Sequence, residues 1–257
     1  MNIKRSTWGL PYLIFLILFV VIPLGLILVY AFLDGSGHFT LSNIGKFFQD
    51  KDSLSTFALS IEIAIENTVL CLLIAYPIAW ILTNRKYNRS AVIIILFILP
   101  MWVNALMRTL ASAELFTMLG MHLGKGTLLF GMVYDYLPFM IYPIYNILQK
   151  MDPSYGEAAE DLGATPWKVF WKVTVPLSKP GIISGVMMVF MPTVSTFAIS
   201  EFLTNNKIKL FGTIIQEKIY ASQWNYGAAL ALVMLVIIGI TSFITEKDNK
   251  EVQGGVV

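Results

Sequence analysis

Residues 10–33 read LPYLIFLILFVVIPLGLILVYAFL, a run without a charged side chain. About 20 apolar residues in a helix cross the roughly 30 Å hydrocarbon core of a bilayer, because each residue adds about 1.5 Å. The run follows Lys4 and Arg5. It is much longer than the apolar part of a secretory signal peptide, which has about 7–15 residues. We therefore predict that it stays in the protein as a membrane helix.

Five further apolar runs follow, separated by short polar breaks. Hydrophobic residues make up 56% of the 257 residues and charged residues only 13%, whereas soluble domains are about 25% charged. The mean hydropathy is +0.70. We predict an all-α polytopic membrane protein, with one transmembrane domain over residues 1–257 and a polar C-terminal tail at about 246–257. The predicted spans cover residues 10–33, 57–82, 91–113, 127–148, 181–203 and 226–245.

The basic residues between the runs predict the orientation, because lysine and arginine are enriched in cytoplasmic connections. They are more numerous on the side that holds the two termini and the connection at 150–180. We therefore expect both termini, and the 150–180 segment, to face the cytoplasm. The residues on that side are Lys4, Arg5, Arg85, Lys86, Arg89, Lys150, Lys168, Lys172, Lys179, Lys247 and Lys250.

The 150–180 segment has the pattern of two short helices joined by a turn. Its first helix can start at Asp152-Pro153, or at Ser154 through a capping box with Glu157. Gly163 is suited to end that helix in a left-handed conformation. Thr165-Pro166 can start the second, which Pro176 and Pro180 would end. We expect its aromatic face to pack against the bundle; that face consists of Trp167, Phe170 and Trp171.

The spacing within this segment resembles a known signature. Glu157-Ala158-Ala159, then Gly163, then Val173-Thr174-Val175-Pro176 is similar to the coupling loop of ABC importer permeases. The resemblance implies a type I (MetI-like) permease that contacts an ATPase through Glu157, Ala158, Ala159, Asp161, Gly163 and Pro176. The alternative is an amphipathic hairpin that only lies on the lipid headgroups.

Three other stretches narrow the resemblance. They are Leu99-Pro-Met-Trp102 running to Arg108-Thr109, Tyr134-Asp-Tyr-Leu-Pro-Phe-Met140, and Trp224-Asn-Tyr-Gly-Ala-Ala-Leu230. Over about residues 55–245 the chain resembles the first permease of spermidine/putrescine importers (PotB-type). That family implies a second, homologous permease, two ATPase subunits and an extracellular polyamine-binding protein, in the bacterial cytoplasmic membrane.

No residue pattern in the chain indicates catalysis. Gly120–Thr127 differs from a phosphate-binding loop, because three residues rather than four separate its first two glycines and Gly126 follows the lysine. Cys71, His38 and His122 form neither a metal set nor a nucleophile with its base. We expect no catalytic residue, no bound metal or cofactor and no nucleic acid partner. ATP and magnesium would bind to the partner ATPase.

Charged residues within apolar runs are costly and often mark a transport path or a structural pair. Asp135, between Tyr134 and Tyr136, could hold an ammonium group by charge and cation–π attraction, or could bond a neighbouring helix. Glu62 and Glu66 could be solvated, and Glu114 could pair with Arg108. The candidate path comprises Asp135, Tyr134, Tyr136, Glu201, Trp102 and Phe197, with Pro192 as a kink that could gate it.

The functions that fit these features are transport functions. The acidic excess within the spans favours a cationic substrate, and the family resemblance favours polyamines. Thr196 departs from the acidic residue that the family often has near this position. An importer permease for another small solute is the alternative, and an ion-coupled carrier that uses Asp135 and Glu201 is a further one.

Overall fold

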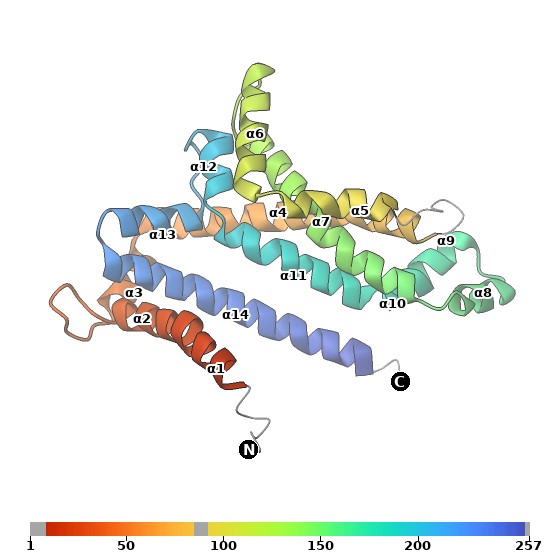
Figure 1. Ribbon diagram of the computed structural model, residues 1–257, viewed down its shortest axis with the longest axis horizontal. Coiled ribbons are helices and arrows are strands. Elements are labelled where there is room, and N and C mark those ends of the chain that lie inside the picture. The colour runs from red at the N-terminus through yellow and green to blue at the C-terminus, as the bar shows by residue number, and fades with distance from the viewer. Residues whose placement is uncertain (1–8, 85–91, 255–257) are drawn as a thin grey trace. The chain divides into compact units, whose positions relative to one another are not determined.

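The computed structural model describes residues 9–84 and 92–254, which are mainly helical (Figure 1). The first half contains α1 (Leu10–Leu16), η2 (Ile17–Val21), α2 (Ile22–Ala31), α3 (Ser42–Gln49), α4 (Lys51–Thr83), α5 (Val92–Ile98), η3 (Leu99–Trp102) and α6 (Ala105–Met118). The second half contains α7 (Lys125–Lys150), α8 (Ser154–Asp161), α9 (Pro166–Val169), η4 (Phe170–Thr174), α10 (Val175–Leu177), α11 (Lys179–Ser195), α12 (Ala198–Thr204), α13 (Phe211–Tyr220) and α14 (Trp224–Gly254).

Four stretches of helix are long and apolar enough to cross a membrane, and two bent helix pairs bring the number to six if each pair is one span. The four are Leu10–Ala31, Lys51–Thr83, Lys125–Lys150 and Trp224–Phe243. The pairs are Val92–Trp102 with Ala105–Met118, bent by 92°, and Pro166–Leu177 with Lys179–Ser195, bent by 63°. The all-α polytopic prediction is therefore confirmed.

Two predicted spans are interrupted. The third breaks at Val103–Asn104, where Pro100 lies in a 3₁₀ turn and the Asn104 side chain accepts hydrogen bonds from the first amides of α6. In the fifth, the helix passes through Pro192 and ends at Ser195, and Thr196 is extended. The helix therefore breaks about one turn after Pro192, where the break was expected. Proline removes only one backbone hydrogen bond, and the rest of the helix remains intact.

Some of the expected boundaries change as well. α4 begins at Lys51, before the apolar run at residue 57, and α14 continues to Gly254, through most of the predicted polar tail. Part of the charge argument lies outside the described residues, namely Lys4, Arg5, Arg85, Lys86 and Arg89 and the side chains of Lys247 and Lys250.

The helices form two compact units, Met1–Ser55 with Ile214–Ile238, and Thr56–Thr213 with Gly239–Val257. In the first unit, one carbonyl ties three segments together. The side-chain amides of Asn43 and Asn225 both donate to the Leu33 carbonyl, each at 2.8 Å. Tyr226 donates to Asp50 at 3.1 Å. The Trp224-Asn-Tyr-Gly motif therefore holds the start of α14 against the connections on both sides of α3.

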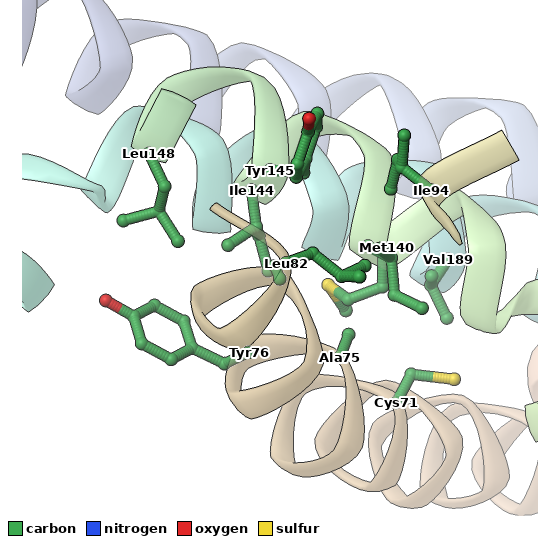
Figure 2. Close-up of a cluster of buried hydrophobic side chains, with 12 residues drawn as sticks. Cys71, Ala75, Tyr76, Leu82, Ile94, Met140, Ile144, Tyr145, Leu148 and Val189 are labelled. Carbon is green, nitrogen blue, oxygen red and sulfur yellow. The ribbon is translucent and has the colours of Figure 1, made fainter. Parts of the chain in front are cut away.

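In the second unit, α4, α7 and α11 share a buried apolar core, shown in Figure 2. Two glycines of α11, Gly181 and Gly185, let this helix approach α7 closely. A Cβ at Gly181 would lie 2.9 Å from the Pro143 carbonyl oxygen, and one at Gly185 would lie 2.7 Å from the Met140 sulfur. Buried members of this core include Cys71, Ala75, Tyr76, Leu82, Ile94, Met140, Ile144, Tyr145, Leu148 and Val189.

A second apolar cluster joins α7 to α6 and α12, which lie beside each other in Figure 1. Polar side chains reinforce the contacts. Thr127, at the start of α7, donates to the Leu203 carbonyl at 2.8 Å, and Asn67 of α4 donates to Thr193 of α11 at 2.8 Å. These bonds satisfy polar groups that burial would otherwise leave unpaired. The cluster consists of Ile63, Phe116, Leu128, Met132, Ile199, Leu203 and Leu210.

Candidate functional site

The 150–180 segment begins with an aspartate that organises the first turn of α8. The Ser154 amide donates to Asp152 Oδ1 at 2.9 Å. This bond is the main reason why the pKa of Asp152 lies below its usual value. Of the two predicted helix starts, the structure supports Asp152-Pro153, because the Asp152 side chain accepts the Ser154 amide. Ser154 is the first residue of α8 and not its N-cap, so it forms no capping box with Glu157.

Gly163 ends α8 as predicted. Its φ is +79°, in the left-handed region that glycine adopts without steric cost. The Gly163 amide bonds the Glu160 carbonyl at 2.8 Å, and the Ala164 amide bonds the Ala159 carbonyl at 3.0 Å. This pair of bonds is a Schellman motif. The turn between α8 and α9 therefore has a fixed geometry, which we call the elbow (Leu162–Thr165).

The second helix starts at Thr165-Pro166, as expected, but it does not stop at Pro176. The carbonyl of Thr165 accepts the amides of Lys168 and Val169 at 2.8 and 2.9 Å. Pro176 lies within the first turn of α10. The bend toward α11 falls at Ser178, a buried residue whose hydroxyl lies 2.8 Å from that of Tyr76.

The aromatic face of this helix is only partly buried. Phe170 packs edge-on against Tyr76 and Trp80 of α4, with ring centroids 5.7 and 5.8 Å apart. Trp167 and Trp171, however, are 71% and 53% exposed. The expectation that all three rings pack against the bundle is thus wrong for the tryptophans, whose rings pack on Phe170 and on each other.

Of the residues that the resemblance assigns to ATPase coupling, all but Pro176 lie on α8 and the elbow. Glu157, Ala158 and Asp161 are exposed on α8, and Ala159 is half-buried. Leu162, on the elbow, is 90% exposed. The fixed turn thus holds an apolar side chain exposed beside these residues.

A second site surrounds Asp135 in the second unit. Its carboxylate is not free, because Arg108 Nε of α6 lies 3.2 Å from Asp135 Oδ1, and both side chains are buried. Thr109 donates to Asp135 Oδ2 at 3.1 Å. The guanidinium carbon of Arg108 lies 5.7 Å from the centre of the Tyr134 ring. Arg108 therefore pairs with Asp135, and the suggested pair with Glu114, an exposed residue, is not observed.

The pair lines a pocket of about 390 Å³, which we call the α6–α7 pocket. Of the candidate path residues, the pocket brings together Asp135, Tyr136 and Trp102, the last of which is 88% exposed. Tyr134 contacts Arg108 instead, and Glu201, Phe197 and Pro192 are not among the lining residues. The lining includes Trp102, Asn104, Arg108, Asp135, Tyr136 and Phe139.

Glu62 and Glu66, one turn apart on α4, both form ion pairs with the side chain of Lys125. Lys125, the first residue of α7, lies 2.8 Å from Glu62 Oε1 and 2.9 Å from Glu66 Oε1. All three side chains are at least 36% exposed. The acidic excess that suggested a cationic substrate is therefore smaller than the residue types indicate, because Arg108 and Lys125 offset part of it.

Sequence reasoning missed Lys125, Thr109 and Tyr76 as parts of these sites. The distances along the chain explain this, since Lys125 meets glutamates about sixty positions away and Tyr76 meets Ser178 about a hundred away. Asn104 did carry a local signal. An asparagine after a proline-containing break and before an apolar run is a helix N-cap pattern.

Comparison with known proteins identifies the family. The model for "Binding-protein-dependent transport system inner membrane component" matches residues 2–247. The spermidine/putrescine transport system permease protein PotB of Haemophilus influenzae is 31% identical over 91% of this chain and 90% of its own. The inner membrane ABC transporter permease YdcU of Escherichia coli is 27% identical over 78% of this chain and 73% of its own.

Solved structures agree at the level of the fold. A bacterial ABC transporter that imports alginate matches with a TM-score of 0.65 over 94% of both chains, at 15% identity. The inward-facing MetNI methionine transporter matches with a TM-score of 0.60 over 77% of this chain and 95% of its own, at 14% identity. The chain thus belongs to the family of binding-protein-dependent transport system inner membrane components, the non-catalytic membrane subunits of ABC importers.

Proposed function

We propose that this chain is the permease of an ATP-driven importer for polyamines. The observation that carries the substrate is the 31% identity to a spermidine/putrescine permease over nine-tenths of both chains. The same fold occurs in importers of alginate and methionine, so the fold itself does not select the substrate. Selection then depends on the extracellular binding protein and on the side chains along the path.

We further propose that the elbow couples the permease to its ATPase. Glu157, Ala158, Ala159, Asp161 and Gly163 would dock on the ATPase, while Pro176 belongs to the helix that passes the movement to α11. The exposed Leu162 and the fixed turn at Gly163 support this role, because a rigid contact transmits a displacement that a flexible loop would absorb. Closure of the ATPase dimer would then switch the path between inward-open and outward-open.

The complex that this function requires has four further protein subunits. A homologous permease would form the path together with this chain in the bacterial cytoplasmic membrane, and two ATPase subunits would bind ATP and magnesium at the cytoplasmic face. A polyamine-binding protein would deliver the substrate from outside. Both termini of this chain would be cytoplasmic, in agreement with the distribution of basic residues.

The test is uptake by the whole complex in sealed vesicles. We expect ATP to drive spermidine or putrescine accumulation after the proton and sodium gradients are collapsed. Loss of uptake under these conditions would instead support the ion-coupled carrier. Calorimetry of the binding protein with spermidine, putrescine and unrelated solutes tests the substrate separately. Tight binding of another solute would favour the alternative importer, which the neutralised charge of Asp135 also supports.

A further inference from the structure

Arg108 and Asp135 form an ion pair that is almost fully buried. The side chains are 7% and 3% exposed, and their helices, α6 and α7, belong to candidate spans. Taking two charges out of water costs free energy that a close ion pair recovers only when the remaining donors and acceptors are also bonded. The completeness of the hydrogen bonding therefore indicates whether such a pair is a structural tie.

The bonding of this pair is incomplete. In the part of the chain that the structure describes, Arg108 Nε and Nη1 and Asp135 Oδ1 are buried and have no hydrogen-bond partner. Nε and Oδ1 are 3.2 Å apart, so the charges attract each other, but the N–H group is not aligned with the oxygen. Arg–carboxylate pairs in proteins frequently form two parallel hydrogen bonds, which this pair does not form.

These unbonded atoms belong to residues that line the α6–α7 pocket. The pocket of about 390 Å³ also has aromatic walls, contributed by Trp102, Tyr136 and Phe139. An aromatic wall beside a carboxylate attracts an alkylammonium group, because the rings favour both the positive charge and the methylene chain. The pocket therefore has the chemistry of an ammonium site whose carboxylate already holds a cation.

The guanidinium of Arg108 makes both contacts that the sequence suggested for a substrate ammonium. It pairs with Asp135, and it lies over the Tyr134 ring at 5.7 Å. We propose that Arg108 is a built-in competitor for Asp135, and that an ammonium group of the translocated substrate replaces it during transport. This inference rests on the proposed polyamine function.

The replacement has consequences for selectivity. Thr109 donates to the other carboxylate oxygen, so Asp135 keeps its position when Arg108 leaves. A neutral or anionic solute gains nothing at Asp135 and leaves the arginine in place. A small inorganic cation does not fill the aromatic pocket. When the substrate moves on, Arg108 returns and no bare carboxylate remains to retain the ammonium.

The experiment measures spermidine uptake by the reconstituted whole complex with four permease variants. We expect Asp135→Asn to lower uptake efficiency by about tenfold or more, because the ammonium loses its charged partner. Arg108→Gln should stay active with a KM lowered by about tenfold, because the competitor is gone, and with a lower maximal rate, because the substrate is released more slowly. The double variant should remain as poor as Asp135→Asn. Glu114→Gln, which removes an exposed carboxylate on the same helix, is the matched control and should behave as wild type.

A purely structural pair gives a different pattern. Each single variant would then leave an uncompensated buried charge, and the double variant would restore uptake toward wild type. That restoration, or an Arg108→Gln variant with unchanged KM, would overturn the inference while wild-type spermidine uptake upheld the proposed function. Absence of wild-type spermidine uptake would overturn both.

A measurement on the wild-type complex does not depend on how the variants fold. Phenylglyoxal modifies accessible guanidinium groups, and mass spectrometry of the peptide that contains Arg108 quantifies the reaction. We expect faster modification of Arg108 during ATP-driven turnover with spermidine than during ATP hydrolysis without it. An equal rate under both conditions would contradict the displacement of Arg108.

Discussion

Gly163 has a left-handed backbone although the space around it is open. Its φ is +79°, and a Cβ built on it would meet no atom within 4 Å. Neighbouring residues therefore do not prevent a side chain here. The constraint comes from the left-handed backbone itself, in which a Cβ lies too close to the following carbonyl oxygen. Asparagine often occupies such positions, whereas a β-branched residue does not. Comparing asparagine with a β-branched residue at this position therefore tests the left-handed turn, and not merely the presence of a side chain.

We expect Gly163→Val to reduce ATP-driven uptake strongly and Gly163→Asn to retain most of it. Valine would strain the turn by about 1–2 kcal/mol, or shift it and displace Leu162 from the docking surface. Uptake and ATP hydrolysis by the reconstituted complex measure the effect, with membrane content as the control for assembly. Equal activity of the two variants would show that the left-handed turn is not required for coupling.

Arg108 and Asp135 show where inference from a single sequence stops at the residue scale. Both were recognisable as charges in apolar runs, but the partner of Arg108 was sought nearby, at Glu114. The observed partner lies on another helix. Helical spacing predicts contacts within one helix, whereas a contact between helices depends on how they pack. Trp102 and Tyr136 were both assigned to the candidate path, and the α6–α7 pocket contains both.

At the scale of elements, the apolar runs predicted the membrane helices well because span length is set by bilayer thickness. The interruptions were predicted less well. Pro192 lies inside a continuing helix, while the breaks occur at Val103–Asn104 and Thr196. Proline removes one backbone bond, which a packed helix can tolerate. A polar N-cap such as Asn104, in contrast, supplies a new helix start.

The contact between α7 and α11 gives a stability prediction with a control in the same chain. Gly181→Ala would place a Cβ 2.9 Å from the Pro143 carbonyl oxygen, and we expect it to destabilise the protein by about 1–3 kcal/mol. Gly239→Ala on α14 would meet no atom within 4 Å and should be neutral or stabilising by up to about 1 kcal/mol. Thermal unfolding in detergent measures both. Equal effects would argue against close packing at Gly181.

The bend between α10 and α11 gives a prediction about coupling. Tyr76 of α4 holds the buried Ser178 hydroxyl at 2.8 Å, and Ser178 also bonds the Val175 carbonyl at 3.0 Å. Because Ser178 keeps this second partner, Tyr76→Phe should cost only about 0.5–1.5 kcal/mol of stability. We expect it to loosen the bend and lower the uptake per ATP hydrolysed. Tyr142→Phe, which changes a 44% exposed tyrosine on α7, is the control and should leave this ratio unchanged.

At the scale of the whole molecule, the orientation of the chain in the membrane decides which connections each partner can reach. The family places the chain in an ABC importer. The proposed coupling role requires the exposed elbow to face the cytoplasm, where ATP is available. The distribution of lysine and arginine predicts that the elbow and the α2–α3 connection face opposite sides of the membrane.

Cysteine labelling tests this orientation directly. Cys71 is the chain's single cysteine and is fully buried, so a Cys71→Ala background can carry one new thiol at a time. Ser36→Cys lies in the α2–α3 connection and Glu160→Cys on α8, and both positions are exposed. Because lysine and arginine concentrate on the side of the elbow, we expect a membrane-impermeant maleimide to label Ser36→Cys in spheroplasts and Glu160→Cys in inside-out vesicles. The reverse pattern would invert the topology and place the elbow where no ATP is available.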